Sequence, residues 1–279
     1  MVSAAYTPDT ANFTGSFSAA DNAPSVTITG APSGTVQAVN TTFNFTATFT
    51  DTDTVPQTHS GAWSFDNASI PGMVSDANGT VTASYSFAAA GVYGVKLTVN
   101  DGVGGITIAN SVSSVNAPPN LTAQVVAYDP SAGFVTGGGW INSPAGAYTA
   151  NTSLTGKATF GFVSKYEKGA TVPTGETEFN FQVANFNFHS ALYQWLVISG
   201  PMAQYKGSGT INGSGNYNFI LTGRDGALVG GSTPDGFRIK ITDPVSGSVI
   251  YDNLLSTDDS VTSANTQTLG GGSIVVHSK

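Results

Sequence analysis

The sequence predicts an all-β protein built from two β-sandwich modules, and three observations lead to that prediction. Alternating apolar and polar residues, as in Phe43-Asn-Phe-Thr-Ala-Thr-Phe49, recur along most of the chain, and a period of two is that of a half-buried strand. The tripeptide Asn22-Ala-Pro24 returns as Asn116-Ala-Pro118, a spacing close to the roughly 100 residues of one sandwich. The 279 residues are enough for two domains, each with its own core.

The first module is expected over residues 23–117, as an immunoglobulin-like sandwich. Its strands are predicted at residues 25–29, 41–50, 59–65, 80–87 and 91–100. Pro118-Pro119 ends the module, because proline cannot donate to a strand ladder, and residues 118–124 are predicted to be a linker. Residues 1–22 are expected to be a tail or the end of a preceding module.

The second module is expected over residues 125–279. Its strands are predicted at residues 134–142, 154–165, 178–188, 193–200, 203–211, 217–222, 237–242, 248–251 and 272–277. Glycine-containing turns such as Asn212-Gly-Ser-Gly215 and Arg224-Asp-Gly226 separate them. About nine strands with such turns predict a jelly-roll-like sandwich.

The composition narrows the classes of partner. Only 9% of the residues are charged, the net charge is −8, and there is no cysteine. The scattered lysines and arginines do not form a phosphate-neutralising surface, so nucleic acid is not an expected partner. No apolar run is long enough to insert into a membrane, and the first residues do not have the pattern of a signal peptide. We expect a piece of a longer exported protein, located extracellularly or at a cell surface.

Two groups of motifs carry a family resemblance. Tyr85-Ser-Phe87, Ala90-Gly-Val-Tyr93 and Leu97-Thr-Val-Asn-Asp101, together with the tryptophan strand around Trp63, resemble a PKD domain over residues 23–117. The C-terminal block resembles the module of bacterial secreted and surface proteins labelled post-COAP-1. The motifs that carry this second resemblance are Gly137-Gly-Gly-Trp-Ile141, Phe160-Gly-Phe-Val-Ser-Lys-Tyr166, Asp235-Gly-Phe-Arg-Ile-Lys-Ile241 and Tyr251-Asp-Asn253. These resemblances imply a bacterial surface or secreted assembly.

No enzyme motif is present in the sequence, since the nucleophile elbow, the zinc-protease pair of histidines and the phosphate-binding loop are all missing. Glu176 and Glu178 are two residues apart, so on a strand they face the same side and could act as a pair, or simply be solvated. His189 follows an alternating segment without a second histidine at ligand spacing. We expect no catalytic activity; a hydrolase that uses His189 with a carboxylate is an alternative.

Calcium is the expected cofactor, if there is one, because the loops offer hard oxygen ligands. Asp51-Thr-Asp53 begins like an EF-hand loop, but Pro56 and Ala62 occupy the positions that need Gly and Glu. In the second module, four aspartates beside turns are the candidate ligands: Asp225, Asp235, Asp243 and Asp252. The alternative is that each caps the backbone of its own turn.

Aromatic residues are the candidate ligand contacts: Trp140, Trp195, Tyr193 and Tyr166. Trp140 follows three glycines, which would leave its indole uncovered, while core packing is the alternative for both tryptophans. Trp63 is expected in the core. The predicted function is therefore non-catalytic adhesion or ligand binding, with a polysaccharide or cell-surface glycan as partner. The alternative is a structural spacer or filament subunit, whose partners are copies of itself joined by strand exchange.

Overall fold

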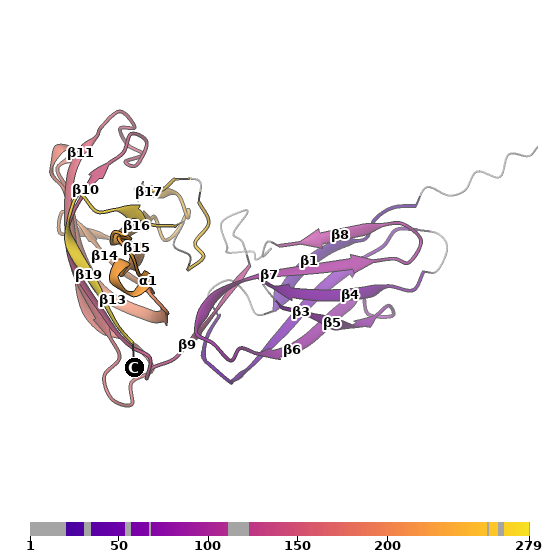
Figure 1. The fold of residues 1–279 in the computed structure, drawn as a ribbon. Helices are drawn as coiled ribbons and strands as arrows, with labels where there is room; N and C mark the ends of the chain where they lie inside the picture. Colours follow the sequence, from indigo (N-terminus) through magenta and orange to yellow (C-terminus); the bar gives the residue numbers. More distant parts are fainter. Residues whose placement is uncertain are drawn as a thin grey trace, which may run out of the picture.

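The computed structural model describes residues 21–30, 35–53, 57–66, 68–110, 123–255, 257–261 and 265–278. Most of these residues lie in β-strands, very few lie in helices, and the strands form two curled sheets, one for each sandwich (Figure 1). The prediction of an all-β chain with two sandwiches is confirmed. Among the described residues, no helix has the length and apolar character needed to cross a membrane.

The first sandwich contains β1 (Ser25–Gly30), β2 (Thr35–Ala38), β3 (Thr42–Thr50), β4 (Ser60–Phe65), β5 (Ala68–Ser75), β6 (Thr80–Ser86), β7 (Gly91–Asn100), β8 (Ile106–Ala109) and β9 (Gln124–Tyr128). Strand β5 pairs with β4 along its first half and with β6 along its second half. The sheet therefore folds over at β5 and encloses an aromatic core. Trp63 is fully buried there, 5.5 Å from Phe45 between ring centroids, as predicted for this tryptophan.

The boundary between the modules differs from the prediction. Strand β9 pairs in parallel with β2 and antiparallel with β7, so residues through Tyr128 belong to the first sandwich and not to the second. Most of the predicted linker, residues 118–122, lies outside the described residues, as do residues 1–20 of the predicted tail. Ala123, the first described residue after that gap, is buried and its carbonyl accepts a hydrogen bond from the Val95 N–H.

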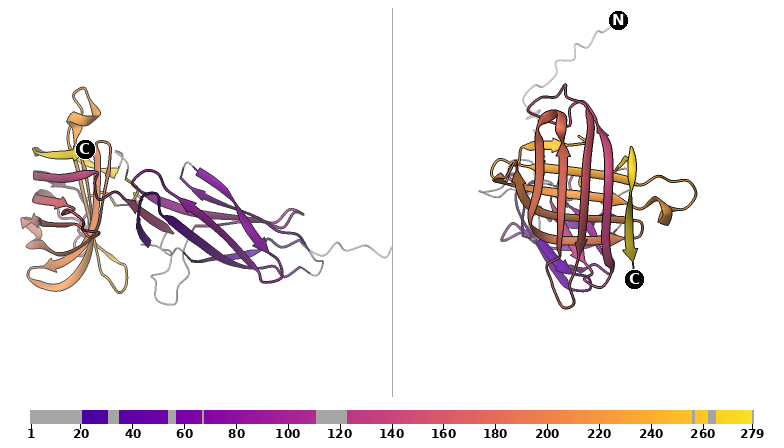
Figure 2. Two further views of the ribbon diagram at one scale, coloured as in Figure 1. Left: turned by 90° about the horizontal axis from the view of Figure 1, so that it is seen from below. Right: turned by 90° about the vertical axis from the view of Figure 1, so that its left-hand side faces the viewer.

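The second sandwich contains β10 (Gly133–Ser143), β11 (Gly156–Lys165), β12 (Thr174–Phe181), β13 (Phe186–Ser199), β14 (Met202–Ile211), β15 (Ser214–Arg224), β16 (Gly236–Thr242), β17 (Val249–Asp252), β18 (Gln267–Thr268) and β19 (Gly271–Ser278). From β10 to β17 each strand pairs with the next in the chain, and β19 pairs with β10. The strand order is thus a meander and lacks the two Greek keys of a jelly roll. Figure 2 shows the two halves of the sheet crossing one another. Phe160 of β11 stacks on Phe237 of β16, 3.9 Å apart between centroids.

One predicted strand, residues 178–188, is a tight hairpin. Strand β12 ends at Phe181, the short 3-10 helix η1 (Gln182–Ala184) follows, and Asn185 turns the chain into β13 with a φ of 49°. Asparagine tolerates this left-handed conformation better than most residues. The turn has neither glycine nor proline, which is why the alternating pattern on both sides looked continuous.

The two sandwiches touch through a small apolar cluster. Trp195 and Val197 of β13 pack with Val92 of β7 and Val126 of β9. Trp195 is only 3% exposed. Strand β9 lies between the two sandwiches in Figure 1, so the chain that leaves the first sandwich also forms part of the surface on which the second one rests.

Candidate functional site

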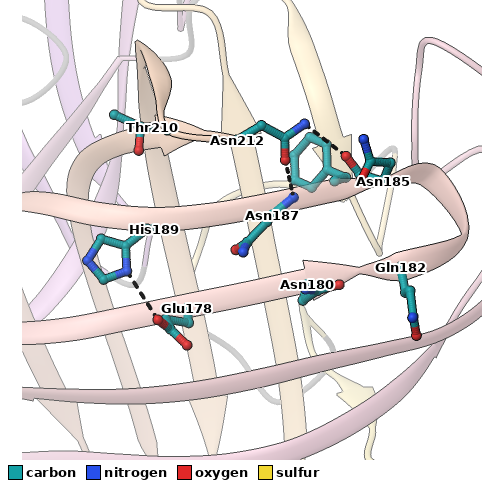
Figure 3. A pocket seen from close by; sticks show the side chains of 10 residues that line it. Glu178, Asn180, Gln182, Asn185, Asn187, His189, Thr210 and Asn212 are labelled. Carbon is teal, nitrogen blue, oxygen red and sulfur yellow. Dashed lines mark hydrogen bonds and ion pairs between the residues drawn. The ribbon is translucent and has the colours of Figure 1, made fainter.

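A polar pocket of about 740 Å³ lies on the outer face of the second sandwich, over β12, β13 and β14 (Figure 3). Its lining residues are Glu178, Asn180, Gln182, Asn185, Phe186, Asn187, His189, Thr210, Asn212 and Gly213. Five of these carry side-chain amides, each of which offers both hydrogen-bond donors and acceptors. The pocket is therefore suited to a ligand with many hydroxyl groups.

Strand alternation places these side chains outside. On β12, Phe179 and Phe181 are buried in the core while the neighbouring Glu178 and Asn180 are exposed. On β13, Phe186 and Phe188 point inward and Asn187 and His189 point outward. Because successive side chains of a strand face opposite sides, burial of the phenylalanines forces the polar residues into water.

Register aligns the outward residues in two rows across the strands. Glu178 pairs with His189, which pairs with Thr210. One step along, Asn180 pairs with Asn187, and the Asn187 carbonyl accepts a hydrogen bond from the Asn212 N–H at 2.7 Å. Neighbouring strands lie about 4.8 Å apart, so polar groups repeat at regular short intervals over the pocket floor.

Asn212 holds the end of the pocket in place. Its side-chain oxygen accepts a hydrogen bond from the Asn187 N–H at 3.0 Å, and its side-chain nitrogen donates to the Asn185 carbonyl at 2.8 Å (Figure 3). Both Asn185 and Asn212 have positive φ. The side chains of Asn180 and Asn187, in contrast, make no hydrogen bond within the described residues and remain available to a ligand.

Glu176, Glu178 and His189 form an exposed cluster beside the pocket, with one ligand atom of each within 4.8 Å of the others. The two glutamates do face the same side of their strand, as expected. The His189 Nδ1 lies 3.4 Å from the Glu178 Oε1, and the two side chains are 51% and 67% exposed. A polar contact this exposed adds little stability, so both side chains can also contact a ligand.

Trp140 lies on the same outer face. It pairs with Thr159, which pairs with Asn180, so its row continues into the row of Asn180 and Asn187. The indole is partly buried because it rests on Gly270 and on Gly271, the first residue of β19: a Cβ at Gly270 would lie 2.2 Å from a ring carbon, and one at Gly271 would lie 2.6 Å from the ring nitrogen. The Lys157 Nζ lies 4.8 Å from the ring centroid. The indole is thus less open than predicted.

The glycines before Trp140 do not surround it with open space. Gly137 and Gly139 point away from the outer face, since a Cβ at Gly137 would meet the Phe162 ring at 2.7 Å and one at Gly139 would meet the Gly271 carbonyl oxygen at 2.3 Å. Gly138 faces outward, opposite Gly161 of β11. No atom lies within 4 Å of a Cβ placed at Gly161. Because neither glycine has a side chain, the sheet surface is uncovered at this pair, next to Trp140.

The other three predicted aromatic contacts are engaged inside the protein. Trp195 is buried between the sandwiches, which leaves no face of its ring for a sugar. The Tyr193 hydroxyl is 2.7 Å from the Thr177 Oγ1. The Tyr166 hydroxyl accepts a hydrogen bond from the Leu196 N–H at 3.0 Å, and its ring stacks on Tyr128. Burial raises the pKa of both tyrosines.

The four aspartates predicted to bind calcium do not converge. Asp225 caps the short helix α1 (Gly226–Val229) through Ala227 N–H and Leu228 N–H, and its other oxygen accepts from the Val276 N–H. Asp235 accepts from the Gly226 N–H and the Ile274 N–H. Each carboxylate is therefore occupied by backbone donors.

The other two candidates, Asp243 and Asp252, have partners in a different part of the second sandwich. Asp243 accepts from Val245 N–H, Ser246 N–H and the Ser246 hydroxyl within its own turn, which is the capping role that was the alternative. Asp252 forms a bidentate ion pair with buried Arg238, with distances of 3.0 and 2.8 Å. The four do not form a joint ligand site in the structure, because each carboxylate has protein partners of its own.

No protein-family model matches the sequence, and no curated protein does either. The resemblances to a PKD domain and to a post-COAP-1 module therefore stay predictions from the residues.

The asparagines of the pocket are candidate binding residues that the sequence did not predict. A signal was present, since Phe-Asn-Phe and Phe-Asn-Phe-His segments place Asn180, Asn187 and His189 opposite a phenylalanine face. Nothing in the sequence shows that these strands are neighbours in register.

Proposed function

We propose that this chain is a non-catalytic extracellular protein of a bacterial surface or secreted assembly, and that the second sandwich binds carbohydrate through its outer face. The observation that carries the proposal is the cross-strand row formed by Trp140, Thr159, Asn180 and Asn187. An aromatic ring at one end and unpaired amides at the other match a ligand whose surface alternates between apolar ring faces and hydroxyl groups.

The dimensions favour an extended saccharide over a single small molecule. Strands β10 and β13 are three strand positions apart, which is about 14 Å at ordinary spacing. The glycine pair Gly138 and Gly161 lies beside this row, so a ligand can lie flat between Trp140 and the pocket. Lys157, an exposed and flexible side chain, must swing off the indole when the ring is engaged.

The geometry favours binding over hydrolysis. A glycosidase needs two carboxyl groups on opposite sides of the bond that is cut, whereas Glu176 and Glu178 project from one strand into water. The extracellular location and the resemblance to PKD and post-COAP-1 modules belong to the same proposal. We expect no turnover of glycoside, ester or peptide substrates above that of a His189→Ala control.

The test is a glycan array with the full chain, followed by calorimetric titration of the best glycan. Asn187→Ala and Trp140→Ala should each lower the affinity at least tenfold. Asn44→Ala is the matched control, because Asn44 is an exposed strand asparagine of the first sandwich. Circular dichroism should show that the fold is intact. Unchanged glycan affinity in both folded variants, or no binding of any glycan by the wild-type chain, would contradict the proposal.

A further inference from the structure

Three carboxylates from distant parts of the first sandwich meet at one of its ends. Asp21 precedes β1, Asp53 follows β3, and Asp101 follows β7. One carboxylate oxygen of each lies within 4.8 Å of the others. Like charges repel at such distances, so their convergence requires compensation.

Asp101 supplies the observation that points to a ligand. It is 1% exposed, and its Oδ1 accepts hydrogen bonds from the backbone N–H groups of Val103, Gly104 and Gly105 at 2.9 to 3.0 Å. Its Oδ2 is buried and has no hydrogen-bond partner among the described residues. A buried, unpartnered carboxylate oxygen carries a large desolvation penalty. This oxygen faces the segment that holds Asp21, since a Cβ at Gly105 would lie 1.9 Å from it and 2.8 Å from the Ala23 Cα.

A second buried oxygen near the three carboxylates, the Gln57 Oε1, also has no hydrogen-bond partner among the described residues. The Gln57 side-chain nitrogen donates to the Asp53 Oδ2 at 2.9 Å and to the Asp21 Oδ1 at 3.3 Å. Turning this amide over exchanges its oxygen and nitrogen, which would direct a neutral oxygen toward the carboxylates of Asp53 and Asp21.

Burial, neighbouring charge and hydrogen bonds shift the pKa values of the three carboxyl groups. Loss of hydration, and after it the negative charge of Asp101, raise the pKa of Asp21. Hydrogen bonds from the Asn22 side chain and backbone lower the pKa of Asp53. Burial opposes ionisation of Asp101, yet its three backbone donors hold its pKa below the usual range. Independently of these shifts, the geometry brings three carboxylates together around the buried Asp101 Oδ2, which has no hydrogen-bond partner among the described residues.

We propose that Asp21, Asp53 and Asp101 bind one calcium ion, with Gln57 Oε1 as a fourth protein ligand. Calcium binds oxygen at about 2.3–2.6 Å and tolerates irregular geometry, and two oxygens on one ion lie at most roughly 5 Å apart. The separation of these carboxylates falls within that limit. Magnesium demands closer, octahedral ligands, so calcium fits the donor set better.

The ion would hold the segment that precedes β1 against the end of the first sandwich. It joins the segment before β1 to the loops that follow β3 and β7. Strand β7 runs from the contact with the second sandwich at Val92 to Asn100 next to this site, a span of roughly 30 Å. The site is thus far from the proposed glycan face, and the two can be tested independently.

The experiment is calorimetric titration of the full chain with calcium chloride after removal of metals by a chelator. The wild type should bind calcium, and Asp21→Asn and Asp53→Asn should each weaken binding at least tenfold. Asp21 is exposed, so its variant should fold normally, and circular dichroism checks this. Asp243→Asn is the matched control, and Glu178→Gln tests the other acidic cluster; both should bind as the wild type does.

Three results would overturn the proposal: no calcium binding by the wild type at millimolar concentration, unchanged affinity in both Asp21 and Asp53 variants, or loss of binding in Glu178→Gln. Magnesium binding as tight as calcium binding would overturn the choice of ion. Glycan binding by the wild type should be the same with chelator and with calcium, so failure of this site and failure of the proposed function give different results.

Discussion

At the residue scale, the role of each aspartate depends on the hydrogen-bond donors and the cationic side chains that surround its carboxylate. Asp252 and Arg238 are both about 2% exposed and form a bidentate pair. The Asp259 carboxylate joins them, 3.2 Å from the Arg238 Nη2 and 2.8 Å from the Lys240 Nζ. Charges are buried inside a protein only when they are paired. Asp252 is therefore part of the structure of the second sandwich and is not available to a metal.

Replacing Asp252 with Asn should strongly destabilise the second sandwich, because it leaves a buried guanidinium short of its main counter-charge. Loss of one partner of a buried pair costs about 3–5 kcal/mol. Glu167→Gln breaks the exposed pair with Lys165, whose side chains are 49% and 58% exposed, and should cost at most about 1 kcal/mol. Urea unfolding measures both. Equal effects of the two variants would contradict this assignment.

Acid should weaken the second sandwich through Asp258. Hydrogen bonds from the Ser260 hydroxyl, and also from the Ser260 N–H and Asn265 amide, lower the pKa of Asp258 in the folded protein. A lowered folded pKa stabilises the protein above the unfolded pKa of about 4, and this stabilisation is lost as the pH falls through the folded value. Asp258→Asn keeps the acceptor but does not titrate, so its melting temperature should fall less steeply below pH 4. A steeper fall in the variant would refute the role of Asp258.

At the scale of the element, strand β19 shows how an edge is protected. It pairs with β10 on one side, and on the other side the N–H groups of Ile274 and Val276 donate to the carboxylates of Asp235 and Asp225 at 2.7 and 3.0 Å. Open N–H groups on an edge strand invite pairing with another chain. The two aspartates occupy these donors, which disfavours assembly through this part of the edge.

Asp235→Ala should release the Ile274 and Gly226 N–H groups and lower the free energy of unfolding by about 1–3 kcal/mol. Asp235→Asn keeps one acceptor oxygen and should lie between the alanine variant and the wild type. Thermal unfolding gives the stabilities, and sedimentation velocity detects self-association through the exposed edge. An alanine variant that is as stable as the wild type and does not self-associate more than the wild type would be incompatible with a capping role.

At the scale of the whole molecule, the sandwiches meet at the apolar cluster around Trp195 and at the stack of Tyr128 on Tyr166. Trp195 is the largest side chain of the cluster formed with Val92, Val126 and Val197. Because β9 and β7 belong to one sheet, both of the first sandwich's valines are held rigidly. The contact therefore links the orientation of the first sandwich to that of the face proposed to bind glycan.

Trp195→Ala should uncouple the two sandwiches while leaving each folded. Truncation of a buried tryptophan costs about 3–5 kcal/mol, and here part of that cost falls on the contact between the sandwiches. Small-angle X-ray scattering should show a wider range of overall dimensions than in the wild type, and calorimetry should show two separate transitions. A single unchanged transition and an unchanged scattering curve would show that Trp195 does not hold the sandwiches together.

The sequence alone determined the class of fold and the faces of its strands. Alternation is a local property, so Glu176 and Glu178 could be assigned to one side of their strand without knowledge of any partner strand. The hairpin at Asn185 was missed because a left-handed asparagine leaves no clear mark in the sequence.

Only the tertiary structure decided what those faces do. Register, which depends on pairing between distant segments, placed Trp140 in line with Asn180 and Asn187. Long-range pairing also decided which backbone N–H groups were left for Asp225 and Asp235, and it brought Asp21, Asp53 and Asp101 together. Since a carboxylate binds whatever donor or cation lies beside it, its role could not be settled before its neighbours were known.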